Sequence, residues 1–208
     1  MFIVFEGPDH TGKTSLLQEL SKELKKENYK VSFTREPGGT LLGEAIRDIL
    51  KNPEFSDMSD QCEIMLFAAS RAEHCKKINK LLDEQYTVIS DRFVQSSYVY
   101  QGYLREKTPL VYNINHVATR GFKQDLVVFV TCDPEEAISR CDPNDRKELS
   151  LTKEDIYKIH EYYQIIYEEG IGNNEEWIVI DTTGKTVEES YRLLIENLKP
   201  YMINFVKE

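Results

Sequence analysis

Short apolar runs alternate with longer stretches of helical periodicity along the whole chain. The runs are rich in β-branched and aromatic residues, and they cover Phe2–Glu6, Tyr29–Thr34, Tyr86–Ser90, Leu126–Thr131 and Trp177–Ile180. Hydrophobic positions three or four residues apart predict helices near 13–27, 40–51, 59–84, 94–103, 109–120, 133–140, 152–169 and 186–198. Near-continuous apolar runs of this length are typical of strands that are buried on both faces.

This alternation predicts an α/β fold with a parallel sheet and right-handed crossover connections. With 208 residues, the chain is long enough for one domain spanning 1–208. Ligands of such sheets bind beyond the carboxyl ends of the strands. The residues that follow each predicted strand are therefore the first candidates for a functional site.

Residues 7–14 follow the first predicted strand and read GPDHTGKT, which fits the phosphate-loop pattern G-x-x-x-x-G-K-[ST]. Glycines let backbone N–H groups cradle phosphate oxygens, and the helix that follows points its positive end at the same anion. We expect Lys13 to reach the β- and γ-phosphates and Thr14 to ligate Mg²⁺. We also expect Lys13 to be solvated in the unliganded protein. The predicted ATP contacts are Gly7, Asp9, His10, Thr11, Gly12, Lys13, Thr14 and Ser15.

A second segment, 182–186, reads TTGKT and also lies between a predicted strand and a predicted helix. The first glycine of the pattern would have to be residue 179, which is Val179, so we interpret 182–186 as a polar turn. For 7–14 the alternative is an ordinary glycine turn, which the full motif in this context disfavours.

Charged residues follow the second and third predicted strands as well. Arg35 precedes a Pro-Gly-Gly turn, after which Thr40 is expected to cap a helix. Asp91 could support Mg²⁺, and Arg92 could hold a phosphate in bidentate fashion; the alternative for this pair is a surface ion pair. After the fourth strand, Asp133 is better explained as an N-cap, with Pro134 and Glu136 completing a capping box.

Spacings of four, four and three place Glu63, Phe67, Arg71 and His74 on one face of the predicted helix 59–84. Phe67 could stack on a flat base while Arg71 donates to its edge, although core packing is the more common role of a single Phe. Four polar side chains that cluster beyond Arg92 could line the same pocket: Ser96, Ser97, Tyr100 and Gln101.

The net charge of −10 disfavours a broad nucleic-acid surface, so any anion site must concentrate cations locally. The four cysteines form no C-x-x-C pair and have no His partners at zinc spacing, so we expect reduced thiols in a cytoplasmic protein. The chain opens without a basic segment, and no apolar run approaches the roughly 18 residues of a membrane span. We therefore expect neither a signal peptide nor a membrane partner.

With these residues in view, the chain resembles the thymidylate kinases of the P-loop nucleoside-monophosphate kinase group. The segments that carry the resemblance are 5–7 leading into the phosphate loop, 34–40 (TREPGGT), 66–74 (LFAASRAEH), 91–93 (DRF), 96–97 (SS) and 100–101 (YQ). The resemblance implies a three-layer α/β/α, P-loop NTPase fold around a five-stranded parallel sheet. It also implies a homodimer, with ATP and Mg²⁺ as donor and cofactor.

The resemblance further implies a role for each matching residue. Asp9 would hold the sugar 3′-hydroxyl, Phe67 would stack on thymine and Arg71 would read its edge. The acceptor nucleotide would be contacted by Asp9, Arg35, Glu36, Pro37, Arg47, Phe67, Arg71, Arg92, Ser96, Ser97, Tyr100 and Gln101. The implied catalytic residues are Asp9, Lys13, Arg92, Arg140 and Arg146, and the implied metal-site residues are Thr14 and Asp91.

One departure concerns the catalytic cation. Some members of the family carry an arginine at the position of His10, whereas others place the cation in a lid. The chain is similar to the second type, with a short lid at about 140–150 that contains Arg140 and Arg146.

The expected reaction is phosphoryl transfer from ATP to dTMP, which gives dTDP and ADP for dTTP synthesis. A kinase of another deoxynucleoside monophosphate, especially dUMP, is the nearest alternative. A P-loop GTPase would need an Asn-Lys-x-Asp base reader, but residues 79–82 read NKLL. A P-loop nucleic-acid module is disfavoured by the charge.

Overall fold

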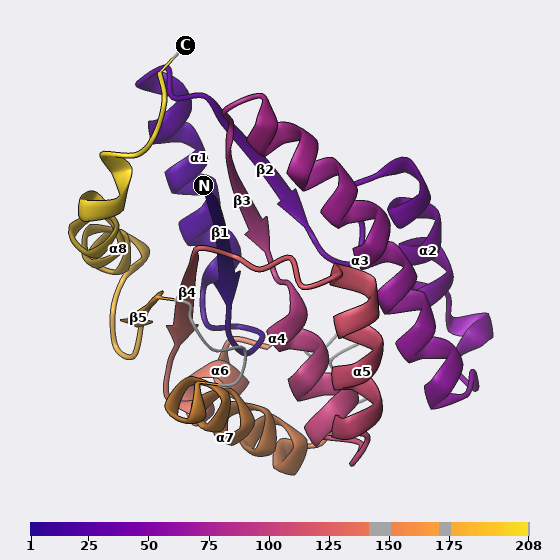
Figure 1. Ribbon diagram of the computed structural model, residues 1–208. Coiled ribbons are helices and arrows are strands. Elements are labelled where there is room, and N and C mark those ends of the chain that lie inside the picture. Colours follow the sequence, from indigo (N-terminus) through magenta and orange to yellow (C-terminus); the bar gives the residue numbers. More distant parts are fainter. Residues whose placement is uncertain (142–150, 171–175, 208) are drawn as a thin grey trace.

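The computed structural model describes residues 1–141, 151–170 and 176–207 as an α/β fold (Figure 1). Five strands form one sheet: β1 (Phe2–Glu6), β2 (Val31–Arg35), β3 (Thr87–Asp91), β4 (Leu126–Thr131) and β5 (Glu176–Asp181). The strand order is β2-β3-β1-β4-β5, and all four pairings are parallel. The predicted fold class is therefore confirmed.

The helices are α1 (Lys13–Lys26), α2 (Leu41–Lys51), α3 (Asp60–Asp83), α4 (Val94–Ser97), α5 (Thr108–Thr119), α6 (Pro134–Ser139), α7 (Lys153–Glu169) and α8 (Val187–Met202). A short 3₁₀ turn, η1 (Pro53–Phe55), follows α2, and a π-helical turn, η2 (Tyr98–Tyr103), continues α4. The sequence predicted one helix over 94–103, but the chain changes from α to π geometry at Tyr98.

Two hydrophobic clusters, one on each face of the sheet, make three layers. On one face, the clustered side chains come from α3, α4, α5 and α7 and include Ile78, Val111 and Tyr163. On the other face, they come from α1 and α8 and include Leu20 and Leu194. Figure 1 shows α1 and α8 on the opposite side of the sheet from α3 and α5.

Burial differs between the strands. All residues of β1 and most residues of β3 and β4 are buried, as their apolar sequences predict. The edge strands β2 and β5 are only partly buried, so burial on both faces was a wrong expectation for these two. An edge strand has a neighbour on one side only, and its helix cover is incomplete.

Both predicted helix caps, Thr40 and Asp133, are confirmed, but the capping box expected at Asp133 does not form. Thr40 accepts a hydrogen bond from the Gly43 amide and caps α2. Asp133 caps α6 by accepting from the amides of Glu135 and Glu136. The capping box expected with Glu136 is wrong, because its carboxylate pairs with Arg140 and accepts from the Gly184 amide instead.

All five strands run in the same direction, so their carboxyl ends meet at one edge of the sheet, at the bottom of Figure 1. The loops that follow β1, β2 and β3 carry several of the predicted site residues, among them Asp9, Glu36 and Arg92, and lie at this edge. Among the described residues, no helix is long and apolar enough to cross a membrane.

Candidate active site

The loop between β1 and α1 takes a conformation that depends on glycine. Gly7 has a φ of +137°, and a Cβ at this position would lie 2.0 Å from the carbonyl oxygen of Val130 on β4. Gly12, the N-cap of α1, has a φ of +92°. These two residues let the loop turn closely past the sheet, so that the amide groups at the start of α1 point to the space above it.

Lys13 is buried, which corrects the expectation that it is solvated. Its ammonium donates to the Gly7 carbonyl at 2.8 Å and to the Pro8 carbonyl. Burial and the neighbouring Arg92 lower the pKa of Lys13 to about 8. The loop carbonyls thus satisfy the ammonium in the unliganded protein, in the place where phosphate oxygens would do so.

A cavity of about 730 Å³ opens beside this loop, and we call it the donor pocket. Nine of the predicted site residues line it: Asp9, His10, Gly12, Lys13, Thr14, Ser15, Asp91, Arg92 and Arg140. Gly7 and Thr11 form the loop without lining this cavity. A cavity of this size can hold a nucleotide.

The donor pocket also contains residues that the sequence did not single out. Segment 182–186 forms a turn, as predicted, yet Thr182, Lys185 and Thr186 line the pocket. The Thr182 hydroxyl donates to the Thr11 carbonyl at 2.9 Å, which ties the end of β5 to the phosphate loop. The sequence gave no signal for this contact, because only the sheet order brings these two segments together.

Arg140, at the end of α6, reaches back to the phosphate loop. Its guanidinium donates to the His10 carbonyl at 3.1 Å and to Thr182, and it pairs with Glu136 at 2.5 Å. Arg140 therefore lies at the donor pocket. Arg146 and most of the lid expected at 140–150 lie outside the described residues.

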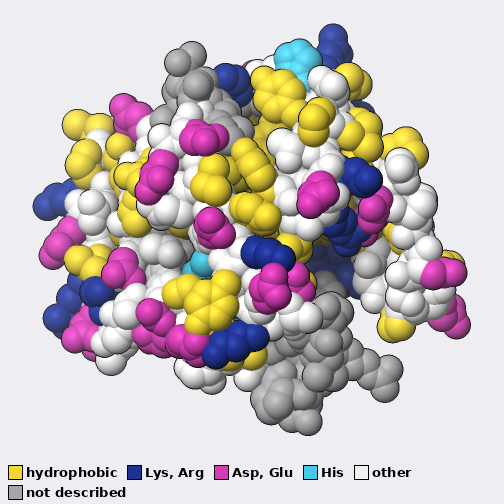
Figure 2. Space-filling model, turned by 90° about the horizontal axis from the view of Figure 1, so that it is seen from below, with side chains coloured by type: hydrophobic (Ala, Val, Ile, Leu, Met, Phe, Trp, Pro, Cys, Tyr) yellow, Lys and Arg dark blue, Asp and Glu magenta, His cyan; other side chains and the backbone are white. Residues whose placement is uncertain are grey.

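A second cavity, of about 530 Å³, lies on the other side of Asp9, and we call it the acceptor pocket. Its lining includes every residue predicted to contact the acceptor: Asp9, Arg35, Glu36, Pro37, Arg47, Phe67, Arg71, Arg92, Ser96, Ser97, Tyr100 and Gln101. Figure 2 looks onto this end of the molecule and shows Lys and Arg side chains gathered at a hollow. An acidic protein thus concentrates cations here.

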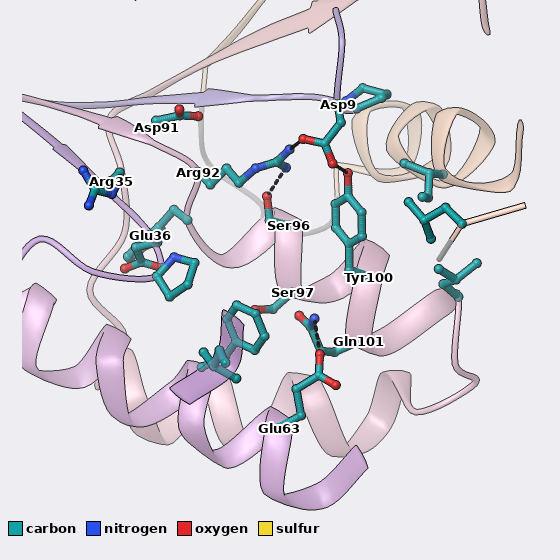
Figure 3. A pocket seen from close by; sticks show the side chains of 18 of the residues that line it. Asp9, Arg35, Glu36, Glu63, Asp91, Arg92, Ser96, Ser97, Tyr100 and Gln101 are labelled. Carbon is teal, nitrogen blue, oxygen red and sulfur yellow. Dashed lines mark hydrogen bonds and ion pairs between the residues drawn. The ribbon is translucent and has the colours of Figure 1, made fainter. Parts of the chain in front are cut away.

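Arg92 lies at the centre of the site (Figure 3). Its guanidinium pairs with Asp9 at 2.5 Å and donates to Ser96 at 2.8 Å and to Tyr163 at 2.9 Å. Tyr100 donates to the other Asp9 oxygen at 2.9 Å. Burial opposes the ionisation of Asp9, but Arg92 and Lys13 outweigh it and hold the pKa of Asp9 below its usual range.

Backbone geometry also sets the position of Arg92, which has a φ of +73°. This left-handed conformation is uncommon for a residue with a Cβ and has a cost in free energy. The Arg92 amide donates to the Phe5 carbonyl at 2.9 Å, so the strained turn is hydrogen-bonded to β1. The turn aims the guanidinium back over the phosphate loop.

Glu6 and Tyr163 hold Arg92 and the residues next to it in place. The sequence did not single out either of them as a site residue. Glu6 is fully buried and accepts from the Phe93 amide at 2.7 Å, from Ser96 at 2.7 Å and from Tyr163 at 3.0 Å. The signal for Glu6 was available, because it is a charged residue that ends an otherwise apolar strand. The sequence contained no such signal for Tyr163, since only packing brings α7 to Arg92.

The acceptor pocket contains two more cations on the side of β2 and α2. Arg47 donates to the Pro37 carbonyl at 2.8 Å, and Arg35 pairs with Glu44 at 2.8 Å. Burial and the nearby Arg35 lower the pKa of Arg47. The two positively charged guanidinium groups repel each other, so an anion bound between them would be stabilised.

Phe67 and Arg71 share a face of α3, as predicted, and both line the acceptor pocket. Arg71 is 2% exposed, and four hydrogen bonds to protein groups hold its guanidinium. The partners are Glu36 at Nε and Nη2, Ser97 and Asn115 at Nη1, and the Phe93 carbonyl at Nη2. Four of the five N–H groups of Arg71 thus make hydrogen bonds to the protein, and the remaining N–H on Nη2 has only the ion-pair contact with Glu36.

The residues at the junction of the two pockets fit a magnesium ion that is bound together with a nucleotide. Asp91 Oδ1 is buried, and no described residue donates a hydrogen bond to it. Asp91 and Thr14 line the donor pocket together. The described residues contain no group of three acidic, His or Cys side chains placed to hold a metal. An ion here would need phosphate oxygens and water, as Mg²⁺ usually does.

The two pockets share four lining residues: Asp9, His10, Asp91 and Arg92. The phosphate loop of the donor pocket therefore faces the cation-rich acceptor pocket, and Arg92 lies between the two. This arrangement allows one phosphoryl group to pass between two bound molecules without a covalent intermediate on the protein. The fold and the site together define a P-loop phosphotransferase.

Comparison with known proteins identifies the family. The thymidylate kinase family model matches residues 5–193. The chain is 38% identical over 174 residues to the thymidylate kinase of Bacillus licheniformis, covering 81% of each chain. It is 37% identical over 206 residues to that of Staphylococcus haemolyticus, covering 95% of this chain and 98% of the relative.

A solved structure agrees with these relatives. The crystal structure of thymidylate kinase from Ehrlichia chaffeensis superposes with a TM-score of 0.72 at 27% identity, covering 96% of this chain and 98% of that chain. The chain belongs to the thymidylate kinase family.

Proposed function

We propose that this protein transfers the γ-phosphoryl group of ATP to dTMP and releases ADP and dTDP. The observation that carries the proposal is the pair of pockets that meet at Asp9 and Arg92, one with a phosphate loop and the other with Arg35 and Arg47. Family membership supports the choice of substrates.

The donor would bind with its phosphates against the loop amides and Lys13. An incoming phosphate would replace the Gly7 and Pro8 carbonyls as partner of the ammonium. Mg²⁺, held by Thr14 and through Asp91, would neutralise charge on the donor phosphates. Arg140, which lines the donor pocket, is placed to add a further positive charge.

The acceptor phosphate would lie among Arg35, Arg47 and Arg92. It is already largely dianionic at neutral pH, because its second pKa is about 6. The attacking oxygen therefore needs no general base. Rate acceleration would come from in-line positioning and from stabilisation of the charge on the transferred group, mainly by Lys13 and Arg92.

The rest of the nucleotide would fill the remainder of the acceptor pocket. Asp9 and Tyr100 are hydrogen-bonded to each other at the wall and would hold the sugar, while Phe67 would stack on the base. Arg71 would donate to a base carbonyl through Nη2, where one N–H has only the ion-pair contact with Glu36. Ser97 and Gln101 complete the wall around the base.

We also propose that the protein acts as a homodimer. Support comes from apolar side chains that are exposed on two adjacent helices, Met65 on α3 at 55% and Val117 on α5 at 75%. Sedimentation equilibrium measures the mass directly. A mass of one chain at micromolar concentration would contradict the dimer and leave the phosphoryl-transfer proposal unaffected.

The test of the activity is product identification. With ATP, Mg²⁺ and dTMP, we expect ADP and dTDP in equal amounts, and almost no ADP when dTMP is omitted. ADP that forms at the same rate without an acceptor would instead indicate a nucleotide hydrolase.

A further inference from the structure

The loop that follows β2 is held against one face of α3. The Gly38 amide donates to the Ser70 hydroxyl at 3.1 Å. The Lys77 ammonium donates to the Gly39 carbonyl at 2.7 Å. Between these two contacts lies His74, which is fully buried and shares this face, since it follows Ser70 by four residues and precedes Lys77 by three. Helix α3 thus fixes the loop that forms one wall of the acceptor pocket.

Both ring nitrogens of His74 meet polar groups. Nδ1 lies 2.8 Å from Glu36 Oε1, and Nε2 lies 2.7 Å from the Thr34 hydroxyl. The second oxygen of Glu36, Oε2, accepts from Arg71 Nε at 2.7 Å. A chain of hydrogen bonds therefore begins at Thr34 on β2, passes through His74 and Glu36, and ends at Arg71. Glu36 and Arg71 line the acceptor pocket, whereas His74 does not.

The charge of Glu36 decides which nitrogen of His74 must carry a proton. The Glu36 side chain is 3% exposed and pairs with the Arg71 guanidinium, so it is a carboxylate that has acceptors only. Nδ1 of His74 is therefore the donor in the contact with Oε1. The Thr34 hydroxyl can donate or accept, so it satisfies Nε2 with or without a proton there.

We propose that His74 is a positioning residue for the acceptor nucleotide: its Nδ1–H holds the Glu36 carboxylate, which in turn aligns the Arg71 guanidinium. The N–H of Arg71 that has only an ion-pair contact is on Nη2, beside Glu36 Oε2. The orientation of the carboxylate thus determines where this N–H points. The inference rests on the proposed function, in which Arg71 contacts the base.

The shape of the site restricts the ring to this arrangement. Gly39 has a φ of +76°, and a Cβ there would lie 2.5 Å from the Thr34 hydroxyl oxygen and 2.7 Å from His74 Nε2. The backbone of the loop therefore covers the ring on the side away from Glu36. A imidazole enclosed in this way cannot turn aside and release the carboxylate.

The test compares His74→Gln with His74→Asn. The amide nitrogen of asparagine can take the place of Nδ1, whereas that of glutamine reaches the place of Nε2, so only asparagine can keep the bond to Glu36. We expect His74→Gln to raise the Kd and the KM for dTMP by about tenfold, the scale of one hydrogen bond to a charged group. Its kcat and its KM for ATP should stay within about twofold of wild type, because uniform binding of the acceptor is lost.

The matched variant separates positioning from packing. His74→Asn should bind dTMP with a Kd within about threefold of wild type, since it keeps the donor to Glu36. A role in packing alone predicts equal losses, because neither amide fills the space of the imidazole. Equal losses in the two variants, or an unchanged Kd for dTMP in His74→Gln, would overturn the inference.

Nuclear magnetic resonance of the wild-type protein with ¹⁵N-labelled histidine is a second measurement that needs no variant to fold. We expect a slowly exchanging proton on Nδ1 of His74 whose signal shifts when dTMP is added and stays in place when ADP is added. An Nδ1 without a proton, or a signal that dTMP does not shift, would overturn the inference. If dTMP binds to the wild-type protein and is not phosphorylated, the proposed function is refuted instead.

Discussion

At the scale of single residues, the site is a chain of opposite charges in contact. Lys13 and Arg92 lie beside Asp9, and Arg92 has the aromatic ring of Tyr100 at 5.3 Å from its guanidinium carbon. Each of these groups has a protein partner before any nucleotide binds. Nucleotide binding therefore replaces existing interactions with new ones, and part of this replacement can be measured as proton uptake.

Lys13 gives a pH-dependent prediction. Its pKa of about 8 means that a fraction of the free protein lacks the ammonium proton near that pH. Donor phosphates favour the charged form, so their binding raises this pKa, takes up protons, and weakens as pH rises through 8. We expect calorimetry at pH 8 in two buffers to show up to about half a proton more taken up by wild type than by Lys13→Arg, because arginine keeps its charge.

The same comparison has an internal control. At about pH 6, wild type and Lys13→Arg should take up equal numbers of protons, since both side chains are charged in the free and bound states. Equal uptake at pH 8 as well would mean that Lys13 is fully charged in the free protein.

Arg140 gives a prediction about the transition state. If it supplies the positive charge that His10 does not, Arg140→Ala should lower kcat by roughly 10²–10³-fold and change KM much less. Arg192→Ala is a matched control, because Arg192 also pairs with a glutamate four residues earlier, at 2.5 Å, but on the exposed face of α8. An unchanged kcat in Arg140→Ala would remove Arg140 from catalysis and leave Arg146 and His10 as candidates.

At the scale of elements, most of the fold was predictable from the sequence. The interior strands β1 and β4 have the predicted ends, since buried parallel strands leave a plain apolar signal. Strand β2 is shifted, and Tyr29 forms an isolated antiparallel bridge to Lys207 instead. A pairing with the far end of the chain leaves no local pattern that could predict it.

The candidate site was predictable to the extent that its residues follow strands or share a helix face. Asp9, Arg35 and Arg92 were found in this way, and all three line the acceptor pocket. Arg105 and Tyr163 were missed, because only the packing of η2 and α7 brings them to the site. The π geometry of η2, which sets the direction of Gln101, likewise has no signature in a pattern of period 3.6.

Helix α7 gives a prediction at this scale, through the hydroxyl that links it to Arg92 and Glu6. Tyr163→Phe should lower the free energy of unfolding by about 1–3 kcal/mol, because the buried Glu6 loses a donor. It should also lower kcat by about tenfold, since Arg92 loses one of its supports. Urea unfolding and steady-state kinetics measure the two effects.

Tyr162→Phe is the control for that variant. The Tyr162 ring stacks on Tyr103 with centroids 5.2 Å apart, and the substitution keeps the ring. Stability and kcat should stay close to those of wild type. If Tyr163→Phe behaves in the same way as Tyr162→Phe, the link between α7 and Arg92 has no role in turnover.

At the scale of the whole molecule, the parallel sheet explains why two distant sets of residues work together. The order β2-β3-β1-β4-β5 places the loop after β1 between the loop after β3 and the loop after β5. The acceptor residues gather on one side of that loop, and the donor residues gather on the other. Transfer of a phosphoryl group between the two sides follows from this topology.

The central claim is that the acceptor pocket is built for a thymine nucleotide. Thymine and uracil differ by one methyl group, which an apolar pocket distinguishes by only about 10–200-fold. Cytosine and the purines would leave polar groups of the pocket poorly paired, at a larger cost.

The measurement that tests this claim most directly is kcat/KM for dTMP, dUMP, dCMP, dAMP and dGMP under one set of conditions. We predict that dTMP and dUMP are both phosphorylated, with dTMP preferred, and that the other three are strongly rejected. A purine nucleotide or dCMP that outperforms both dTMP and dUMP would contradict the account.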